Sequence, residues 1–143
     1  SDINAAYLYS QLECADVIND DRLASWNYYY DALTPLRDAG LIRLPVVSSG
    51  CVHNAHLFRI MTADLAERTR LIAYLRERGI MATFHYVPLH SAPAGRKFGR
   101  FHGRDEFTTA ESDKLVRLPM YYGMAKEDRT AVVEAVSDFY RTR

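Results

Sequence analysis

The stretch AHLFRIMTADLAERTRLIAYLRERGIMATF, residues 55–84, decides the fold class. Its two ends, AHLFRIM and IMATF, are rich in apolar residues and are predicted strands. Asp64, with Glu67 three places on, predicts a capped helix between them, and Gly79 is placed to end it. This strand, helix and strand are long enough for a crossover connection. The helix is expected to bury Leu65, Ile72 and Leu75.

Residues 1–39 predict a long helix or a kinked pair of helices that ends at Gly40. The expected kink is at residues 19–21, where Asn and Asp side chains compete for backbone hydrogen bonds. Cys14 is expected to be an inert core residue, and the run of three tyrosines at 28–30 to serve packing. Apolar residues recur at helical spacing at Ala5, Leu8, Leu12, Ala15, Leu23, Trp26, Tyr30 and Leu33, and Trp26 is expected to pack on Tyr30.

The other segments complete an α+β pattern. We predict a short extended piece at 41–47, a loop at 91–107, a short helix opened by Thr108, a third strand in VRLPM and a last helix over 126–140. That last helix should bury Val132 or Val133, Val136 and Phe139. The predicted architecture is a small sheet of short strands covered by helices, with a long N-terminal helix.

Composition narrows the classes of function. The 143 residues form one domain, and no apolar run approaches the roughly 20 residues of a membrane helix. Eighteen basic side chains balance eighteen acidic ones, so no overall charge draws the chain to nucleic acid or to a membrane. Cys14 and Cys51 are the only cysteines and form no CxxC motif, which favours a reducing compartment, the cytoplasm.

Two groups of residues could in principle bind a metal ion or a phosphate, and only the second has a suitable pattern. Five histidines do not show the spacing of a metal site, and no nearby carboxylate or thiolate completes a set of ligands. The run GRKFGRFHGR, residues 95–104, mixes basic and aromatic side chains and is suited to a local diphosphate contact rather than to a polymer, because no other basic face is predicted. Nucleophile elbows and glycine-rich phosphate loops are absent from the sequence.

Four motifs occur in order along the chain: SDINAAYLYSQLE, NAHLFRI, FHYVPLHSAP and LVRLPMYYGM. Together they resemble the C-terminal third of the DegT/DnrJ/StrS sugar-nucleotide aminotransferases. The resemblance implies the small domain of a fold type I pyridoxal-phosphate enzyme that works as a homodimer. It also implies a sugar nucleotide as acceptor and glutamate as amino donor.

The family's cofactor lysine has no match in this chain. Its lysines are Lys97, Lys114 and Lys126, and none lies in the family's lysine motif. The resemblance therefore implies that residues 1–143 are part of a larger protein and are inactive alone, with no catalytic or cofactor-binding residue of their own. Helical periodicity that is already present at Ser1 supports the same expectation.

By resemblance, His85, Tyr86 and His90 of the FHYVPLH motif reach the sugar side of the cofactor cleft, with His56 as a further contact. Pro88 stiffens this turn, and imidazole and phenol suit sugar hydroxyls and phosphate oxygens. A purely structural role, in which the histidines satisfy buried backbone groups, stays open. So does a different class of protein, a stand-alone module that binds a nucleotide sugar or dimerises without catalysis.

Overall fold

The computed structural model describes residues 1–142 as six helices and a two-stranded sheet. Along the chain these are α1 (Asp2–Glu13), α2 (Ala15–Asp38), β1 (Phe58–Met61), α3 (Leu65–Glu77), α4 (Pro93–Phe98), α5 (Thr108–Ser112), β2 (Leu115–Leu118) and α6 (Lys126–Arg141). None of the helices in this part of the chain is both long and apolar enough to cross a bilayer.

The sheet is wider than its two strands. β1 and β2 pair antiparallel, with Phe58 opposite Leu118 and Met61 opposite Leu115. A single bridge joins Arg43 to Met61 on one side, and another joins Thr83 to Arg117 on the other. The segment at Thr83 therefore runs parallel to β1 with β2 between them, so the predicted crossover through α3 is present. IMATF itself forms only this one bridge instead of the predicted strand.

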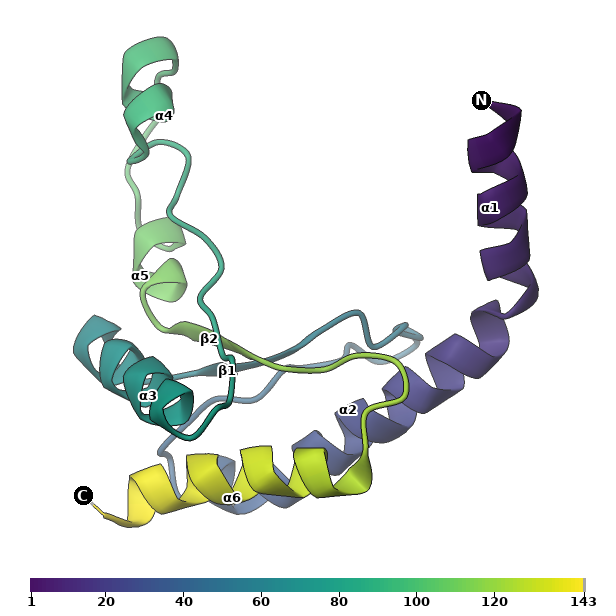
Figure 1. The fold of residues 1–143 in the computed structure, drawn as a ribbon. Coiled ribbons are helices and arrows are strands. Elements are labelled where there is room, and N and C mark those ends of the chain that lie inside the picture. Colours follow the sequence, from purple (N-terminus) through teal and green to yellow (C-terminus); the bar gives the residue numbers. More distant parts are fainter. Residues whose placement is uncertain (143) are drawn as a thin grey trace.

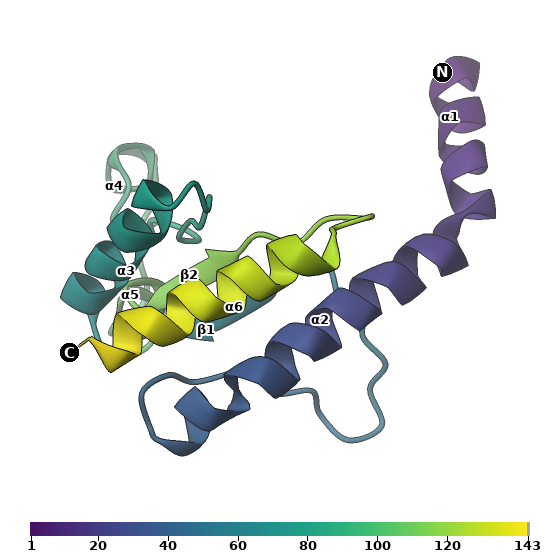
Figure 2. The same cartoon turned by 60° about the horizontal axis from the view of Figure 1, so that its bottom comes forward.

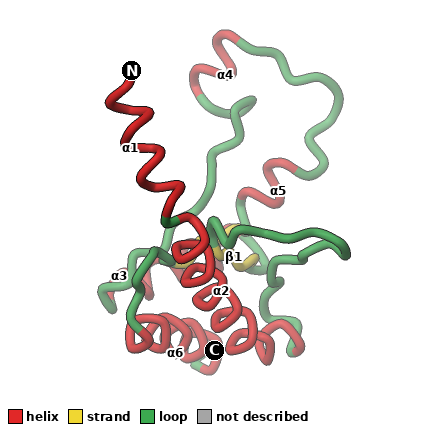
Figure 3. The backbone as a smooth tube through the Cα atoms, turned by 90° about the vertical axis from the view of Figure 1, so that its right-hand side faces the viewer, coloured by secondary structure: helices red, strands yellow, loops and turns green. Residues whose placement is uncertain are grey.

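Three helices cover one face of the sheet. Figures 1 and 2 show α2, α3 and α6 packed together on that face, while α1 and the segment carrying α4 and α5 rise on the other side. The tube in Figure 3 gives the same separation from a third direction. The core between helices and sheet includes Trp26, Tyr29, Leu33, Phe58, Ile60, Leu71, Leu75, Val116, Leu118, Val132 and Val136.

Alternation along the strands directs two charged side chains to the second face of the sheet. Phe58 and Ile60 of β1 are fully buried, whereas Arg59 between them is only partly buried. In β2, Val116 and Leu118 are buried and Arg117 is not. Successive side chains in a strand point to opposite faces. The face that carries Arg59 and Arg117, here called the open face, is therefore directed away from the core.

The N-terminal helices differ from the prediction in two respects. The break lies at Cys14 rather than at residues 19–21, which stay helical. Asp21 accepts a hydrogen bond from the amide of Gly123, at 2.8 Å. Cys14 is exposed, and α1 has no buried residue, so the predicted apolar stripe enters the core only in α2. The stacking of Trp26 on Tyr30 is confirmed, with ring centroids 5.1 Å apart.

The start of α3 agrees with the prediction, whereas its buried face does not. The Asp64 cap is confirmed, with its Oδ1 accepting the Glu67 amide at 2.8 Å. However, α3 buries Glu67, Leu71 and Leu75, one i+4 row, while Leu65 in the first turn is exposed and Ile72 packs at the edge of the core. The predicted last helix is confirmed, and its Val132, Val136 and Phe139 are buried.

Three further predictions fail locally. Residues 91–107 contain α4 rather than only a loop. Thr108 is the first residue of α5 and not its cap, because Asp105 accepts the Thr109 amide at 3.2 Å. The strand predicted for residues 55–61 begins only at Phe58, since Ala55 has a φ of 48° and its carbonyl oxygen accepts a hydrogen bond from Arg22 at 3.2 Å.

Candidate functional site

The FHYVPLH turn follows the bridge at Thr83 and lies at one end of the sheet. Because this segment runs antiparallel to β2, the chain moves from Thr83 toward Leu115 and Met61. There it borders a hollow of about 440 Å³, here called the His85 pocket. The lining comes from the turn, from β1 and β2 and from α5: Arg59, Met61, His85, Tyr86, Val87, Pro88, Leu89, Thr108, Glu111, Ser112 and Leu115.

His85 and Tyr86 form a polar pair on the rim of this pocket. Their ring centroids are 3.9 Å apart, and the Tyr86 side chain is largely exposed. The hydroxyl of Ser112, in α5, donates a hydrogen bond to the Tyr86 carbonyl oxygen. Backbone at the turn is thereby fixed to α5 while the imidazole and phenol groups stay accessible. Ring nitrogens and a phenol in such a position can donate to or accept from sugar hydroxyls.

His90 has a different setting, in which its own chain supplies the partner. Its Nε2 lies 2.8 Å from Oδ2 of Asp105, and the two side chains are only about one-fifth exposed. Phe101 packs on the imidazole, with ring centroids 4.5 Å apart. The Thr109 hydroxyl donates to the same carboxylate, and this hydrogen bond is the largest cause that lowers the pKa of Asp105. His90 therefore joins the turn to the start of α5.

The structure does not bring His56 to this site. His56 precedes Phe58, at the end of β1 opposite Met61, so the length of the strand separates it from the His85 pocket. Its side chain is exposed, and its carbonyl oxygen accepts a hydrogen bond from Arg22. Of the four residues that the sequence predicted as substrate contacts, three lie on or beside the turn and the fourth lies at the far end of the sheet.

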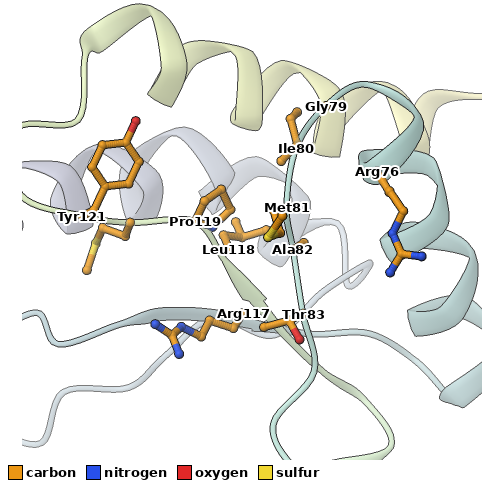
Figure 4. Close-up of a pocket in the computed structure, with 11 residues that line it drawn as sticks. Arg76, Gly79, Ile80, Met81, Ala82, Thr83, Arg117, Leu118, Pro119 and Tyr121 are labelled. Carbon is orange, nitrogen blue, oxygen red and sulfur yellow. The ribbon is translucent and has the colours of Figure 1, made fainter.

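A second hollow lies where two segments of the sheet diverge. Thr83 and Arg117 are bridged, but residues 79–82 before Thr83 diverge from residues 118–121 after Arg117. The two segments leave a pocket of about 960 Å³ between them (Figure 4). This Tyr121 pocket is mainly apolar, with Ile80, Met81, Pro119 and Met120 in its walls and Arg76, Thr83, Arg117 and Tyr121 as its polar members. Tyr121 donates a hydrogen bond to Asp128 at 3.1 Å, which raises the pKa of the phenol.

Sequence reasoning missed the arginines of the sheet. Arg59 lines the His85 pocket and Arg117 lines the Tyr121 pocket, and the two residues face one another across the β1–β2 pairing. The available signal was a charged residue between buried apolar ones in FRIM and in LVRL. The basic run 95–104, by contrast, is mostly exposed on α4 and the loop after it, and contributes to neither pocket.

The possible ligands of a metal or a cofactor are the His, Cys, Asp, Glu and Lys side chains. Across residues 1–142, no three His, Cys, Asp or Glu side chains come together as a metal site would require. None of the three lysines lines either pocket: Lys97 and Lys126 are exposed on helices, and Lys114 lies between α5 and β2. A pyridoxal-phosphate enzyme needs a lysine at its reactive centre. The lysines of this chain do not fit that role.

The family follows from comparison with known proteins. A model of the DegT/DnrJ/EryC1/StrS aminotransferase family matches residues 1–137. This chain belongs to that family. The resemblance inferred from its four motifs is therefore confirmed at the level of the family.

Individual members of the family agree with this assignment. The chain is 27% identical to dTDP-3-amino-3,4,6-trideoxy-alpha-D-glucose transaminase of Micromonospora megalomicea subsp. nigra over 139 residues, which are 96% of this chain and 36% of the relative. It is 30% identical to protein MJ1066 of Methanocaldococcus jannaschii over 142 residues, which are 95% of this chain and 36% of MJ1066. The chain thus spans about a third of the length of these relatives.

Solved structures confirm an aminotransferase fold. DesV of S. venezuelae, solved with a ketimine intermediate, superposes with a TM-score of 0.81 at 29% identity, covering 94% of this chain and 35% of DesV. The aminotransferase TlmJ of Streptoalloteichus hindustanus gives 0.82 at 19% identity, with coverage of 94% and 35%. Spr1654 of Streptococcus pneumoniae, in its PLP form, gives a TM-score of 0.79 at 20% identity, covering 99% of this chain and 36% of Spr1654.

Proposed function

We propose that residues 1–143 are the substrate-side small domain of a cytoplasmic, homodimeric, pyridoxal-phosphate-dependent sugar-nucleotide aminotransferase. The reaction converts the keto group of a 4-keto-6-deoxy sugar, linked to dTDP, into an amino group. Glutamate gives up its amino group in exchange for the keto oxygen and becomes 2-oxoglutarate. The cofactor, when bound, supplies the electron sink for this exchange.

The observation that carries the proposal is the position of the FHYVPLH turn. In a chain of this aminotransferase family, the turn holds His85 and Tyr86 on the rim of a pocket at the open face of the sheet. Val87 and Leu89 of the same turn are exposed close to Tyr86, and contiguous exposed apolar side chains mark interaction surfaces. The proposal explains this exposure, because the remainder of the enzyme would cover the turn and enclose the cleft.

This chain and the remainder of the enzyme have different chemical roles. His85, Tyr86 and His90 bind and orient the sugar, whereas His56 lies at the other end of β1 and does not reach it. The lysine that holds the cofactor lies outside these residues, so the chain alone is inactive. The exposed, unpaired thiols of Cys14 and Cys51 support a reducing compartment such as the cytoplasm.

The proposed substrate is that of dTDP-4-amino-4,6-dideoxygalactose transaminase, an enzyme of enterobacterial common antigen synthesis. Two features support this choice. The motifs SDINAAYL, GCVHNAH, FHYVPLH and RLPMYYG are similar to that enzyme. A relative that acts on a dTDP-linked amino sugar also matches 96% of this chain.

The test is aminotransfer by the intact protein loaded with pyridoxal phosphate. With dTDP-4-keto-6-deoxyglucose and glutamate we expect formation of the 4-amino sugar and of 2-oxoglutarate, measured by mass spectrometry. His85→Gln should lower kcat/KM by at least tenfold, whereas His102→Gln, in the exposed basic run, should leave it unchanged. No aminotransfer to any keto sugar nucleotide would refute the proposal. Unchanged kinetics in His85→Gln would leave that histidine a structural role only.

A further inference from the structure

Arg59 and Arg117 form a directly opposed pair of like charges on the open face. The register of the sheet places them opposite one another across β1 and β2. Their neighbours Phe58, Ile60, Val116 and Leu118 are all buried beneath the helices. Figure 4 shows Arg117 beside Thr83 on the side of the strand that faces away from α6. Both guanidinium groups are therefore carried on the same exposed side of the sheet.

Nothing in the described chain neutralises this pair. Among residues 1–142, neither side chain makes an ion pair or a hydrogen bond with a carboxylate. Glu111, which lines the His85 pocket together with Arg59, is engaged by Arg43 at 2.6 Å. Like charges directly opposite one another destabilise an antiparallel pair of strands. An anion bound between the two guanidinium groups would remove this repulsion.

The two pockets are arranged on either side of this pair. Arg59 belongs to the His85 pocket, which has imidazole, phenol and hydroxyl groups, and Arg117 belongs to the mainly apolar Tyr121 pocket. Both volumes, about 440 and 960 Å³, lie in or near the range of small-molecule sites. A ligand that spans both pockets would place its middle at the two arginines. Nucleoside diphosphate sugars have this composition: a sugar, two phosphates and a nucleoside.

We propose that Arg59 and Arg117 bind the diphosphate of the sugar nucleotide, with the sugar in the His85 pocket and the nucleoside in the Tyr121 pocket. This inference rests on the proposed function and assigns its substrate a position on this chain. Arginine suits the role because its planar group forms paired hydrogen bonds with phosphate oxygens. The basic run 95–104 then has no part in holding the diphosphate.

Binding measured by calorimetry on the intact, cofactor-loaded protein tests the assignment. We expect dTDP to bind and inorganic pyrophosphate to compete with it. Arg59→Gln and Arg117→Gln should each weaken dTDP binding by about 10- to 100-fold, the range for a lost hydrogen bond to a charged group. Arg59→Lys, which keeps the positive charge but loses the planar guanidinium group, should bind dTDP with an affinity between those of the wild type and Arg59→Gln. Arg70→Gln, an exposed arginine on α3, and Arg100→Gln in the basic run should bind as the wild type does.

Thermal unfolding without phosphate adds a readout that does not depend on the ligand. Because each glutamine variant removes a like-charge repulsion, its Tm should equal or exceed that of the wild type, and dTDP should raise it less. Wild-type dTDP affinity in both variants would overturn the assignment. A loss of dTDP affinity in Arg100→Gln alone would also overturn it. Competition with dTDP by L-glutamate but not by pyrophosphate would do the same.

The two proposals fail separately. Aminotransfer with unchanged KM for the sugar nucleotide in both arginine variants would leave the enzyme assignment intact and remove the diphosphate site. Binding of dTDP that depends on both arginines, in a protein that transfers no amino group, would keep the anion site and remove the enzyme assignment.

Discussion

The Nε2 atom of His90 lies 2.8 Å from Oδ2 of Asp105, and this contact joins the FHYVPLH turn to the first residues of α5. Asp105 also accepts hydrogen bonds from the amide and the hydroxyl of Thr109. An ionised carboxylate only accepts, so Nε2 of His90 carries a proton and Nδ1 is left for a further partner. Asp105 thus sets both the tautomer of His90 and the start of a helix.

This arrangement predicts a dependence on pH. The hydrogen bond from the Thr109 hydroxyl, with smaller help from the Thr109 amide and His90, lowers the pKa of Asp105 below its ordinary 3.8. A carboxyl group whose pKa is lower in the folded state stabilises the fold above its unfolded pKa, and this stabilisation is lost as the pH falls through the folded value. We therefore expect the His90 and Thr109 contacts to weaken only below about pH 4.

Carboxyl carbon shifts in an NMR titration measure this directly. Asp105 should titrate with a midpoint below 3.8, and the Thr109 amide should move with it. In Asp105→Asn the acid-induced change at Thr109 should vanish, whereas Glu106→Gln, next in the chain, should keep it. A midpoint at or above 3.8 would contradict the hydrogen bonds described.

Two apparent capping residues should differ in their effect on stability. Asp64 accepts the Glu67 amide at the start of α3, so Asp64→Ala should lower the free energy of unfolding by about 1 kcal/mol, within roughly 0.5–2. Thr108 is already inside α5, and Thr108→Ala should cost less than about 0.5 kcal/mol. Denaturant unfolding of both variants compares them, and equal losses would contradict the assigned helix starts.

Gly95 is required by a close approach of two backbone segments. A Cβ atom at this position would lie 1.6 Å from the Leu89 carbonyl oxygen, so α4 and the FHYVPLH turn cannot keep their spacing in Gly95→Ala. We expect amide shifts across residues 88–98 and a loss of the His90–Asp105 contact. Gly40→Ala is the control: it has a φ of 70° but no atom near its Cβ, so its strain of about 1 kcal/mol should stay at the end of α2. Amide shifts confined to Gly95 itself would refute the close approach.

The exposed apolar side of α1 predicts association. No residue of this helix is buried, and Ile3, Tyr7, Leu8 and Leu12 are among its exposed side chains. Sedimentation of the 143-residue chain should therefore show concentration-dependent self-association. Leu8→Glu with Leu12→Glu should abolish it, and Gln11→Glu, on the same helix, should change it little. A monomer at high concentration would show that this surface does not mediate self-association.

Local signals in the sequence were sufficient for much of the fold. Period and capping patterns located α3, α6 and β2, and the glycine at 40 marked the end of α2, because these features depend on residues within one or two turns. The four ordered motifs identified the family, which residues 1–137 confirm. The break between α1 and α2 was misplaced because Asp21 finds its partner in Gly123, far along the chain.

The tertiary structure decided which functional residues meet. The sequence marked His85, Tyr86 and His90 as substrate contacts with His56 as a further one, but the antiparallel register places His56 at the far end of β1 from the other three. The same register sets Arg59 opposite Arg117, a pairing of residues nearly sixty positions apart that no local pattern contains. Periodicity determines which face of its own strand a side chain occupies, whereas only strand pairing determines what stands beside it.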